Sequence, residues 1–410
     1  MTDQLVSVEE HRDRILSAIE PLPAFDQPLL EAFGLTAAEE VRSAVALPGF
    51  DNSAMDGYAV VHADVASASE ENPVHLPVVG EIGAGQASLL AMSPGTAVKI
   101  MTGAPVPAGA DAVVPYEWTD HGVAQVVITR APEPGQHVRP RGEDVAEGDL
   151  LIEEGAVLGP RQIGLLAAVG RASVRSRPRP RVVILSTGSE LREPGTSLGH
   201  DSVYDGNSFL LAAAARQAGA IAYRVGIVSD EPRTFAAALN DQLVRADLVV
   251  TSGGVSMGDY DVVKEALTPL GTVWFGGVAM QPGKPQGFGM VGEDQVPIIT
   301  LPGNPVSSYI SFEQFVLPAL RRMMGRTPYL RPSADAVLTH AFTSPDGRRQ
   351  FARGILSVVD GRLAVTPVGP QGSHMIGDLA ESDALIVVAE SVTSVEAGET
   401  VTVLPLDEDF

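Results

Sequence analysis

"RVVILSTGSE", residues 181–190, marks the point where the chain turns to a regular alternation of strands and helices. Its first seven residues form a continuous apolar run that ends in two hydroxyls, which is typical of a strand buried on both faces. Similar runs recur at 221–229, 247–252 and 297–301, and helical patterns separate them. This alternation predicts a doubly wound α/β domain, with a parallel sheet and helices on both faces.

Upstream of this domain the chain predicts two helices followed by a small β domain. Ser7 and Glu10 have capping-box spacing, which predicts a helix to about residue 20. "QPLLEAF", 27–33, predicts a short helix that ends at Gly34. Short Val-rich runs between about 58 and 136 read as strands of a β domain.

Three further segments set the expected boundaries and ends of elements. The Pro- and Arg-rich "VRSRPRP", 174–180, is interpreted as a solvated linker and domain boundary. Asn207 is expected to cap the helix that follows it. Beyond residue 329, two apolar runs flank Asp360-Gly361, the favoured hairpin turn, and predict a small all-β domain.

Composition narrows the class of protein. The 410 residues are 45% hydrophobic and carry a formal net charge of −23, which argues against sequence-independent nucleic-acid binding. The absence of cysteine excludes disulfides, thiolate metal sites and cysteine nucleophiles. The first 20 residues lack the apolar core of a signal peptide, and the sequence contains no membrane-length apolar run. We expect a cytoplasmic protein without nucleic-acid or membrane partners.

Three predicted strands of the α/β domain end in loops rich in Gly, Ser and Thr. The loops are "TGSE" (187–190), "SGGVSMGDYD" (252–261) and "PGNPVS" (302–307). Carboxyl ends of parallel strands meet at one edge of a sheet, and backbone N–H groups at the following helices favour anions. The three loops together therefore predict a site for a phosphate-bearing ligand.

Acidic residues accompany these loops, namely Glu190, Asp230, Asp259 and Asp261. Carboxylates beside a phosphate site would repel the ligand unless a hard cation lay between them. Oxygen ligands on loops, completed by phosphate, are typical of Mg²⁺. The alternative is that some of these acids only cap helices, as Asp230 could.

Basic and hydroxyl side chains follow in the second half of the chain. Lys284 is flanked by Pro282-Gly283 and Pro285, which would fix the backbone around its ammonium group. Arg353 and Ser373 also lie on expected turns, although spacing alone does not bring them to the sheet.

A final unusual stretch is "LPGFDNSAMDGYAV", 47–60. It contains more polar and turn-forming residues than a surface turn requires, including Asp51 and Asp56. Gly57 is expected to supply a positive φ.

With these motifs in hand, the chain resembles the molybdopterin molybdenumtransferases, the MoeA family, which is related to the E domain of gephyrin. The resemblance rests on eight stretches in the family's order across residues 48–374. They are "PGFDNSAMDGYAV", "IMTGAPVPAGADAVVPYE", "RGEDVAEGD", "STGSEL", "VTSGGVSMGDYD", "PGKPQGFG", "LPGNPVSS" and "QGSH".

The resemblance implies four domains and a homodimer. It implies an elongated domain from 1–50 and 137–178, an inserted β domain at 51–136, a molybdopterin-binding α/β domain at 179–328 and a C-terminal β-barrel at 329–410. In such proteins the inserted domain of one subunit faces the α/β domain of the other across the active-site cleft.

The implied reaction takes adenylylated molybdopterin and molybdate, requires Mg²⁺, inserts molybdenum and releases AMP. The resemblance assigns catalytic roles to Asp56, Thr102, Asp144, Glu190, Asp230 and Asp261, of which the last three would also hold the metal. It assigns pterin and phosphate contacts to Thr187, Gly188, Ser252, Gly253, Gly254, Ser256, Lys284, Pro302, Gly303, Asn304 and Pro305. It assigns molybdate contacts to Gln281, Lys284, Ser307, Arg353 and Ser373.

Several alternatives stay open. Many family members have a second lysine where this chain has Gln281, so molybdate affinity or placement could differ. A molybdopterin adenylyltransferase shares the α/β core but would attach AMP, and a non-catalytic molybdopterin-binding scaffold is a third reading. Tungsten preference, a specialised paralogue and contacts with other cofactor-biosynthesis proteins are also compatible with the sequence.

Overall fold

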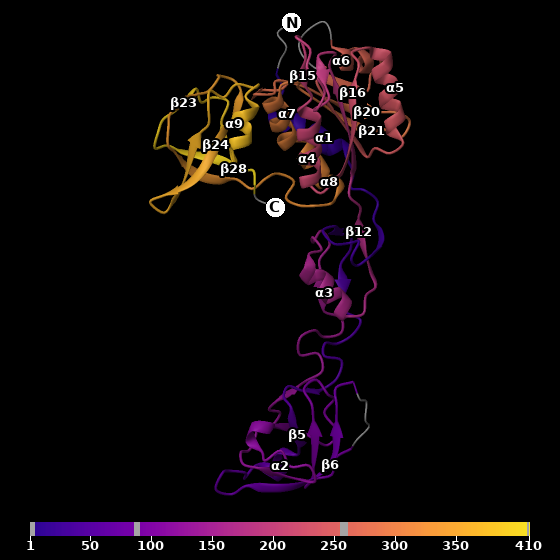
Figure 1. Cartoon of the computed structure of the whole chain (residues 1–410), viewed down its shortest axis with the longest axis vertical. Coiled ribbons are helices and arrows are strands. Elements are labelled where there is room, and N and C mark those ends of the chain that lie inside the picture. The colour runs from indigo at the N-terminus through magenta and orange to yellow at the C-terminus, as the bar shows by residue number, and fades with distance from the viewer. Residues whose placement is uncertain (1–4, 86–90, 255–260, 408–409) are drawn as a thin grey trace. The chain divides into compact units, whose positions relative to one another are not determined.

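The computed structural model describes residues 5–85, 91–254, 261–407 and 410 (Figure 1). The chain divides into two compact units, each described here by itself. The larger unit contains residues 1–38, 155–158 and 174–410, and the smaller contains 39–154 and 159–173. Among the described helices, none has the length and apolar character needed to span a bilayer.

A six-stranded sheet forms the centre of the larger unit. Its order is β16 (Ile221–Val228), β13 (Arg181–Thr187), β17 (Leu248–Ser252), β21 (Val296–Leu301), β20 (Pro285–Val291) and β18 (Val273–Gly277). The first four strands are parallel, as the sequence predicts. Strand β20 runs antiparallel to both of its neighbours, β21 and β18, and the sequence did not predict it as a strand.

Helices cover both faces of this sheet (Figure 1), which confirms the doubly wound α/β prediction. One face packs against α1 (Val8–Ala18), α4 (Asn207–Gln217), α7 (Pro305–Ser311), the π-helical turn Phe312–Val316 and α8 (Leu317–Met323). The other face packs against α5 (Pro232–Leu243) and α6 (Val262–Leu267).

Helix α1 begins as the sequence predicts. The Ser7 hydroxyl accepts from the Glu10 N–H at 3.0 Å, and Glu10 accepts from the Ser7 N–H at 2.8 Å. The buried face of α1 carries His11, whose ring lies 5.0 Å from Trp274 and 4.7 Å from Phe315. Burial, with a smaller contribution from Arg14, lowers the pKa of His11 to about 3. His11 is therefore a neutral part of the core.

Three local expectations are wrong. The segment predicted as helix 27–33 instead contains β1 (Phe25–Pro28) and turns, because Gln27 bonds to the Ser176 hydroxyl at 2.8 Å across a sheet. That sheet has β12 (Ser173–Arg177) at its centre, between β1 and β2 (Thr36–Ala37), so most of the supposed linker is a strand. In both segments tertiary pairing overrides local propensity.

The third wrong expectation concerns the start of α4. Asn207 is its first helical residue, and Gly206 occupies the N-cap position. The capping contact comes from Asp205, whose Oδ1 accepts from the Ser208 N–H at 3.0 Å. The Asn207 side chain is thereby released for another role.

The C-terminal region is a closed β-barrel, as the sequence resemblance implies. Its strands follow the order β24 (Arg349–Val359), β25 (Arg362–Pro367), β22 (Ala334–Leu338), β28 (Thr400–Pro405) and β26 (Ala384–Val388), and β26 pairs back to β24. Strand β19 (Met280–Gln281) adds to the open side of β24. The predicted hairpin is confirmed: Asp360 and Gly361 have φ of 50° and 74°, and Val359 faces Arg362.

The smaller unit contains the predicted small β domain. Its five-stranded sheet has the order β8 (Ala112–Pro115), β5 (Gly57–Val60), β7 (Ala97–Ile100), β6 (Val74–Ile82) and β9 (Gln125–Ile128). The unit also contains α2 (His62–Val65), α3 (Pro160–Ala168), β3 (Val41–Arg42), β4 (Asn52–Ser53), β10 (Val138–Arg139) and β11 (Leu150–Ile152).

Two short strand pairs complete the larger unit. They are β14 (Leu191–Arg192) with β15 (Val203–Tyr204) and β23 (Phe342–Thr343) with β27 (Ser394–Val395).

Candidate functional site

A cavity of about 860 Å³ lies at the carboxyl ends of β13, β17 and β21. The three strands are adjacent and in register, so that Ser186 faces Ser252 and Ser252 faces Leu301. Their loops therefore meet at one edge of the sheet. The predicted residues that line the cavity are Thr187, Gly188, Glu190, Asp230, Ser252, Gly253, Gly254, Pro302, Gly303, Asn304, Pro305 and Ser307.

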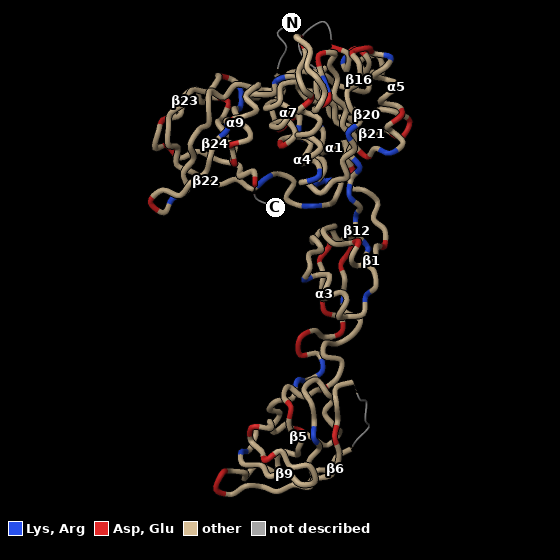
Figure 2. Tube along the Cα trace, in the orientation of Figure 1, with Lys and Arg blue, Asp and Glu red and all other residues tan. Residues whose placement is uncertain are grey.

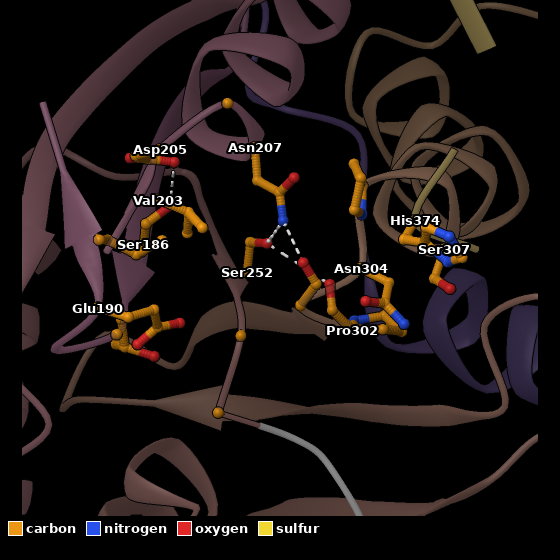
Figure 3. Close-up of a pocket in the computed structure, with 18 of the residues that line it drawn as sticks. Ser186, Glu190, Val203, Asp205, Asn207, Ser252, Pro302, Asn304, Ser307 and His374 are labelled. Atoms are coloured by element: carbon orange, nitrogen blue, oxygen red, sulfur yellow. Dashed lines mark hydrogen bonds between the residues drawn. The ribbon is translucent and has the colours of Figure 1, made fainter. Parts of the chain in front are cut away.

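Asn207 ties two of these loops together (Figure 3). Its amide nitrogen donates to Ser252 Oγ at 2.9 Å and to the Gly303 carbonyl at 2.6 Å. Ser252 Oγ also lies 3.2 Å from Ser308 Oγ in the middle of α7. A single side chain on α4 thus fixes the spacing between the loops after β17 and β21.

A second network fixes the loop between β13 and α4. Asp205 is buried; its Oδ1 accepts from Ser186 Oγ at 3.3 Å, and its Oδ2 accepts from Ser208 Oγ at 2.5 Å. Arg224 lies 3.7 Å from the same carboxylate. Asp205 is therefore held as part of the cavity wall.

Gly253 allows the loops to approach closely. It has a φ of +87°, and a Cβ placed there would lie 2.9 Å from the Thr187 carbonyl oxygen. A larger residue would be strained and would push the loops after β13 and β17 apart. The glycine in "SGG" is therefore required by the geometry of the cavity.

The cavity wall carries negative charge. Glu190 and Asp230 are exposed at the cavity, and Asp230 Oδ2 accepts from the Ser189 N–H at 2.6 Å. Asp261, 5% exposed, precedes the lining residue Val262. Among the described lining residues there is no Lys or Arg. A cation here would offset the repulsion between these carboxylates and an anionic ligand.

The oxygen donors of the cavity fit Mg²⁺ as part of a shell that the protein does not supply alone. Within residues 5–85, 91–254, 261–407 and 410, no three His, Asp or Glu side chains are close enough to hold a metal ion between them. Glu190, Asp230 and Asp261 supply oxygen donors around the cavity, and water or phosphate oxygens would complete the coordination. Ser256 and Asp259 lie outside the described residues.

The residues predicted for molybdate are distributed between the cavity and the barrel. Ser307 lines the cavity, and the Ser373 hydroxyl accepts from the Asn304 amide at 2.9 Å. Lys284 is half-buried, and the next residue, Pro285, lines the cavity. Gln281 lies on β19, where its Oε1 accepts from Arg348 at 3.2 Å.

Arg353 does not line the described cavity. It is 1% exposed, donates to the Gly372 carbonyl at 2.9 Å and lies 3.6 Å from Asp378. Burial lowers the pKa of its guanidinium, and Asp378 opposes that shift. Arg353 thus holds the loop that carries Ser373.

Three predicted catalytic residues belong to the smaller unit. Asp56 Oδ1 accepts from the Thr102 N–H at 2.7 Å and from Thr102 Oγ1 at 2.8 Å. These hydrogen bonds lower the pKa of Asp56. Asp144 is exposed, and its N–H donates to the Leu47 carbonyl at 3.0 Å.

The glycine of the "MDGY" motif serves close packing, so the expected positive φ is wrong. Gly57 is absent from the positive-φ residues, and a Cβ placed there would lie 2.0 Å from the Val114 carbonyl oxygen. The adjacent strands β5 and β8 can pair only because this position has no side chain.

The polar cavity residues that the sequence did not predict include Asn207, Asp205 and His374. Asn207 and Asp205 were hidden because Asn and Asp before an apolar helix usually indicate a cap. His374 belongs to the quoted "QGSH" stretch, and its place beside Ser307 at the cavity (Figure 3) follows from how the barrel packs on α7.

Comparison with known proteins agrees with this architecture. Models of the MoeA N-terminal region (domain I and II), a probable molybdopterin binding domain and the MoeA C-terminal region (domain IV) match residues 6–170, 183–322 and 335–406. The fold and the loop-lined cavity thus define a multidomain protein built around a molybdopterin-binding-type α/β domain.

Relatives cover the whole chain. Molybdopterin molybdenumtransferase 2 of Mycobacterium tuberculosis is 46% identical over 98% of this chain and 99% of its own, and the Haemophilus influenzae enzyme is 35% identical over 98% and 99%. A crystal structure of a molybdopterin biosynthesis MoeA protein from Pyrococcus horikoshii, 31% identical, superposes with a TM-score of 0.85 over 99% of this chain and 100% of that one. The chain belongs to the MoeA family of molybdopterin molybdenumtransferases.

Proposed function

We propose that this chain inserts molybdenum from molybdate into adenylylated molybdopterin, with Mg²⁺, and releases AMP. The observation that carries the proposal is the acid-bearing cavity formed by three strand-end loops. It lies in a chain that matches proteins named molybdopterin molybdenumtransferase over nearly its full length.

The cavity loops are proposed to bind the pterin and the phosphates. Thr187, Ser252 and Asn304 offer hydroxyl and amide donors, and the glycines beside them let backbone N–H groups approach the ligand. Ser256 belongs to the same proposed set. Mg²⁺, held by Glu190, Asp230 and Asp261 together with phosphate oxygens, would neutralise the charge that develops as the phosphoanhydride breaks.

Molybdate is proposed to bind where the α/β domain meets the barrel. Molybdate is a dianion, so the Lys284 ammonium and the hydroxyls of Ser307 and Ser373 suit it. Arg353 would act by holding the Gly372 carbonyl and hence Ser373. Because Arg348 occupies the carbonyl oxygen of Gln281, the Gln281 amide N–H groups remain oriented as donors for an oxyanion.

The remaining assignments carry over from the family resemblance. Asp56, Thr102 and Asp144 are proposed to act in the same reaction, in a cytoplasmic homodimer with the four-domain division given above. The hydrogen bonds from Thr102 keep Asp56 ionised to lower pH, which suits a group that must stay charged.

The test mixes purified protein with adenylylated molybdopterin, molybdate and Mg²⁺, then follows AMP release and the molybdenum content of the pterin. We expect molybdate-dependent AMP release that is abolished in Asp56→Ala and in Asp261→Ala. Asp120→Ala is the matched control, since Asp120 accepts backbone N–H bonds in the smaller unit. A protein that binds the pterin but leaves the nucleotide attached would refute the proposal and favour adenylylation or scaffolding.

A further inference from the structure

His374 is the one histidine in the described lining of the cavity at the strand ends. The same lining holds the carboxylates of Glu190, Asp205 and Asp230 and no described Lys or Arg. Imidazole both donates and accepts a proton near neutral pH, whereas carboxylates are ordinarily ionised there. Within the described lining, His374 is therefore the side chain suited to proton transfer.

The backbone at His374 is fixed by the residue before it. The Ser373 hydroxyl accepts from the Asn304 amide at 2.9 Å, and the Ser373 carbonyl accepts from the Val306 N–H at 3.1 Å. Ser373 is thus joined to the start of α7 through both its side chain and its backbone. His374 follows directly and reaches the cavity (Figure 3).

The imidazole ring lies against Gly372 and keeps both nitrogens open. A Cβ placed on Gly372 would lie 3.1 Å from Cε1 and 3.4 Å from Nδ1 of His374. The Gly372 carbonyl is in turn held by Arg353 at 2.9 Å. The His374 side chain is exposed, and within the described part of the chain no hydrogen bond is made to either ring nitrogen. Both nitrogens can therefore exchange a proton with a ligand.

Charged groups of both signs surround the loop that carries His374. Figure 2 shows both basic and acidic segments near β24 and α9 (Ile376–Glu381). Beyond the acids of the lining and the Tyr204 phenol, they are Arg353 of β24, Asp378 and Glu381 of α9, and Lys284 beside the lining residue Pro285. Arg353 and Asp378 lie 3.6 Å apart and offset each other. Within the described lining, a cationic N–H donor can come only from His374.

The proposed insertion of molybdenum includes proton transfer. When the dithiol of the pterin binds molybdate, two Mo–S bonds form and one Mo–O bond breaks. The two thiol protons go to the departing oxygen, so MoO₄²⁻ and the dithiol give a trioxomolybdenum dithiolene dianion and one water. Molybdenum is neither oxidised nor reduced. A side chain that moves a proton between sulfur and oxygen would lower the barrier to this exchange.

We propose that His374 carries a proton from a thiol of the pterin to the departing oxygen of molybdate. This inference rests on the proposed function and adds a residue to it. Ser307 and Ser373, the hydroxyls proposed to bind molybdate, adjoin His374 in space (Figure 3) and in the chain respectively. An oxygen of molybdate held by these hydroxyls would lie beside the imidazole.

The test follows a single turnover of the full chain with adenylylated molybdopterin, Mg²⁺ and varied molybdate, and measures the molybdenum content of the pterin. We expect His374→Ala to insert molybdenum about 10²-fold more slowly at saturating molybdate. The molybdate concentration at half-maximal rate should stay within about threefold of wild type. His374→Gln keeps an N–H donor but exchanges no proton, so it should be as slow as His374→Ala.

Imidazole added to the buffer should restore the rate of His374→Ala in proportion to its concentration, because the lost ring occupied an exposed position at the cavity. His340→Ala is the matched control, since His340 is exposed after β22 and outside the described lining. It should match wild type with and without imidazole.

An insertion rate within about threefold of wild type in His374→Ala would overturn this inference and leave the proposed function intact. So would full activity in His374→Gln, a loss seen only as weaker molybdate binding, or a loss that imidazole does not restore. Wild-type protein that releases no AMP in response to molybdate would overturn the proposed function, and this inference with it.

Discussion

The larger unit contains one cavity at the carboxyl ends of β13, β17 and β21 and another, of about 510 Å³, near the other end of α4, and the charged side chains in their described linings differ. The first is lined by Glu190, Asp205 and Asp230 and by no described Lys or Arg, and the second by five arginines. An anionic ligand in the first cavity would lie beside these carboxylates, and a cation between them would offset the repulsion. The guanidinium groups of the second cavity donate to backbone carbonyls and to Glu313. Under the proposed function, a metal ion in the first cavity would take the part that basic side chains play in other phosphate sites.

The largest expected effect comes from neutralising an acid of the first cavity. Glu190→Gln keeps the size of the side chain but removes the charge that would hold the cation, so we expect AMP release to fall about 10²–10³-fold. Glu193→Gln is the matched control, because Glu193 pairs with Arg224 at 2.8 Å and does not line the described cavity. If the rate of AMP release in Glu190→Gln is within about threefold of wild type, the reaction does not depend on the charge of Glu190 in the first cavity.

The next prediction concerns how the free energy of unfolding depends on pH. The pKa of His11 is about 3 in the folded protein, below its ordinary value of 6.5. The contribution of neutral His11 to the free energy of unfolding is therefore fully present above pH 6.5 and is lost as pH falls towards 3. Unfolding free energy should drop by about 2 kcal/mol between pH 7.5 and pH 5 through this group alone.

Denaturant unfolding of His11→Leu at both pH values checks this prediction. We expect the variant to lose less stability than wild type on acidification, whereas exposed His200→Leu should follow wild type. Equal acid sensitivity of His11→Leu and wild type would show that His11 is protonated in the folded state. Once this pH dependence of stability is known, a loss of activity at low pH can be separated from a loss of folded protein.

A smaller effect is expected at the wall of the first cavity. Asn207→Ala removes the hydrogen bonds to Ser252 and Gly303, which should cost about 1–3 kcal/mol of stability. Looser spacing of the two loops should reduce AMP release about tenfold. Asn240→Ala, exposed on α5, serves as the control. Wild-type AMP release in Asn207→Ala would mean that the loops hold their spacing without this contact.

The smallest expected effect is on the pH dependence of the reaction rate, through Asp56 in the smaller unit. Thr102→Val keeps the backbone donor to Asp56 but removes the hydroxyl donor, so the pKa of Asp56 should rise toward its ordinary value. The acidic limb of the pH–rate profile should move upward by less than about one pH unit. An unchanged limb would show that ionisation of Asp56 does not limit the reaction.

The sequence predicted those features whose determinants are local or strictly periodic. The capping box of Ser7 and Glu10, the buried strand 181–187 and the Asp360-Gly361 turn all depend on near neighbours, and the structure has each of them. The fold class followed because continuous apolar runs alternating with helical patterns leave few other arrangements.

The features that the sequence did not predict depend on contacts distant in the chain. Strand β20 pairs with β21 and β18 through Gly287 and Gly289, which are residues of low strand propensity. The strand at Phe25–Pro28 exists because β12, about 150 residues later, pairs beside it. Asn207 could not be assigned to the cavity because its partners, Ser252 and Gly303, meet only in the folded sheet.

The most direct test of the account measures how Mg²⁺ affects substrate binding. Adenylylated molybdopterin is titrated into the full chain with Mg²⁺ and again with EDTA. We expect binding at least about tenfold tighter with Mg²⁺, and we expect this difference to disappear in the double variant Glu190→Gln/Asp230→Asn. Equal affinity with Mg²⁺ and with EDTA would contradict it, because the acid-lined cavity would then accept the phosphates without a cation.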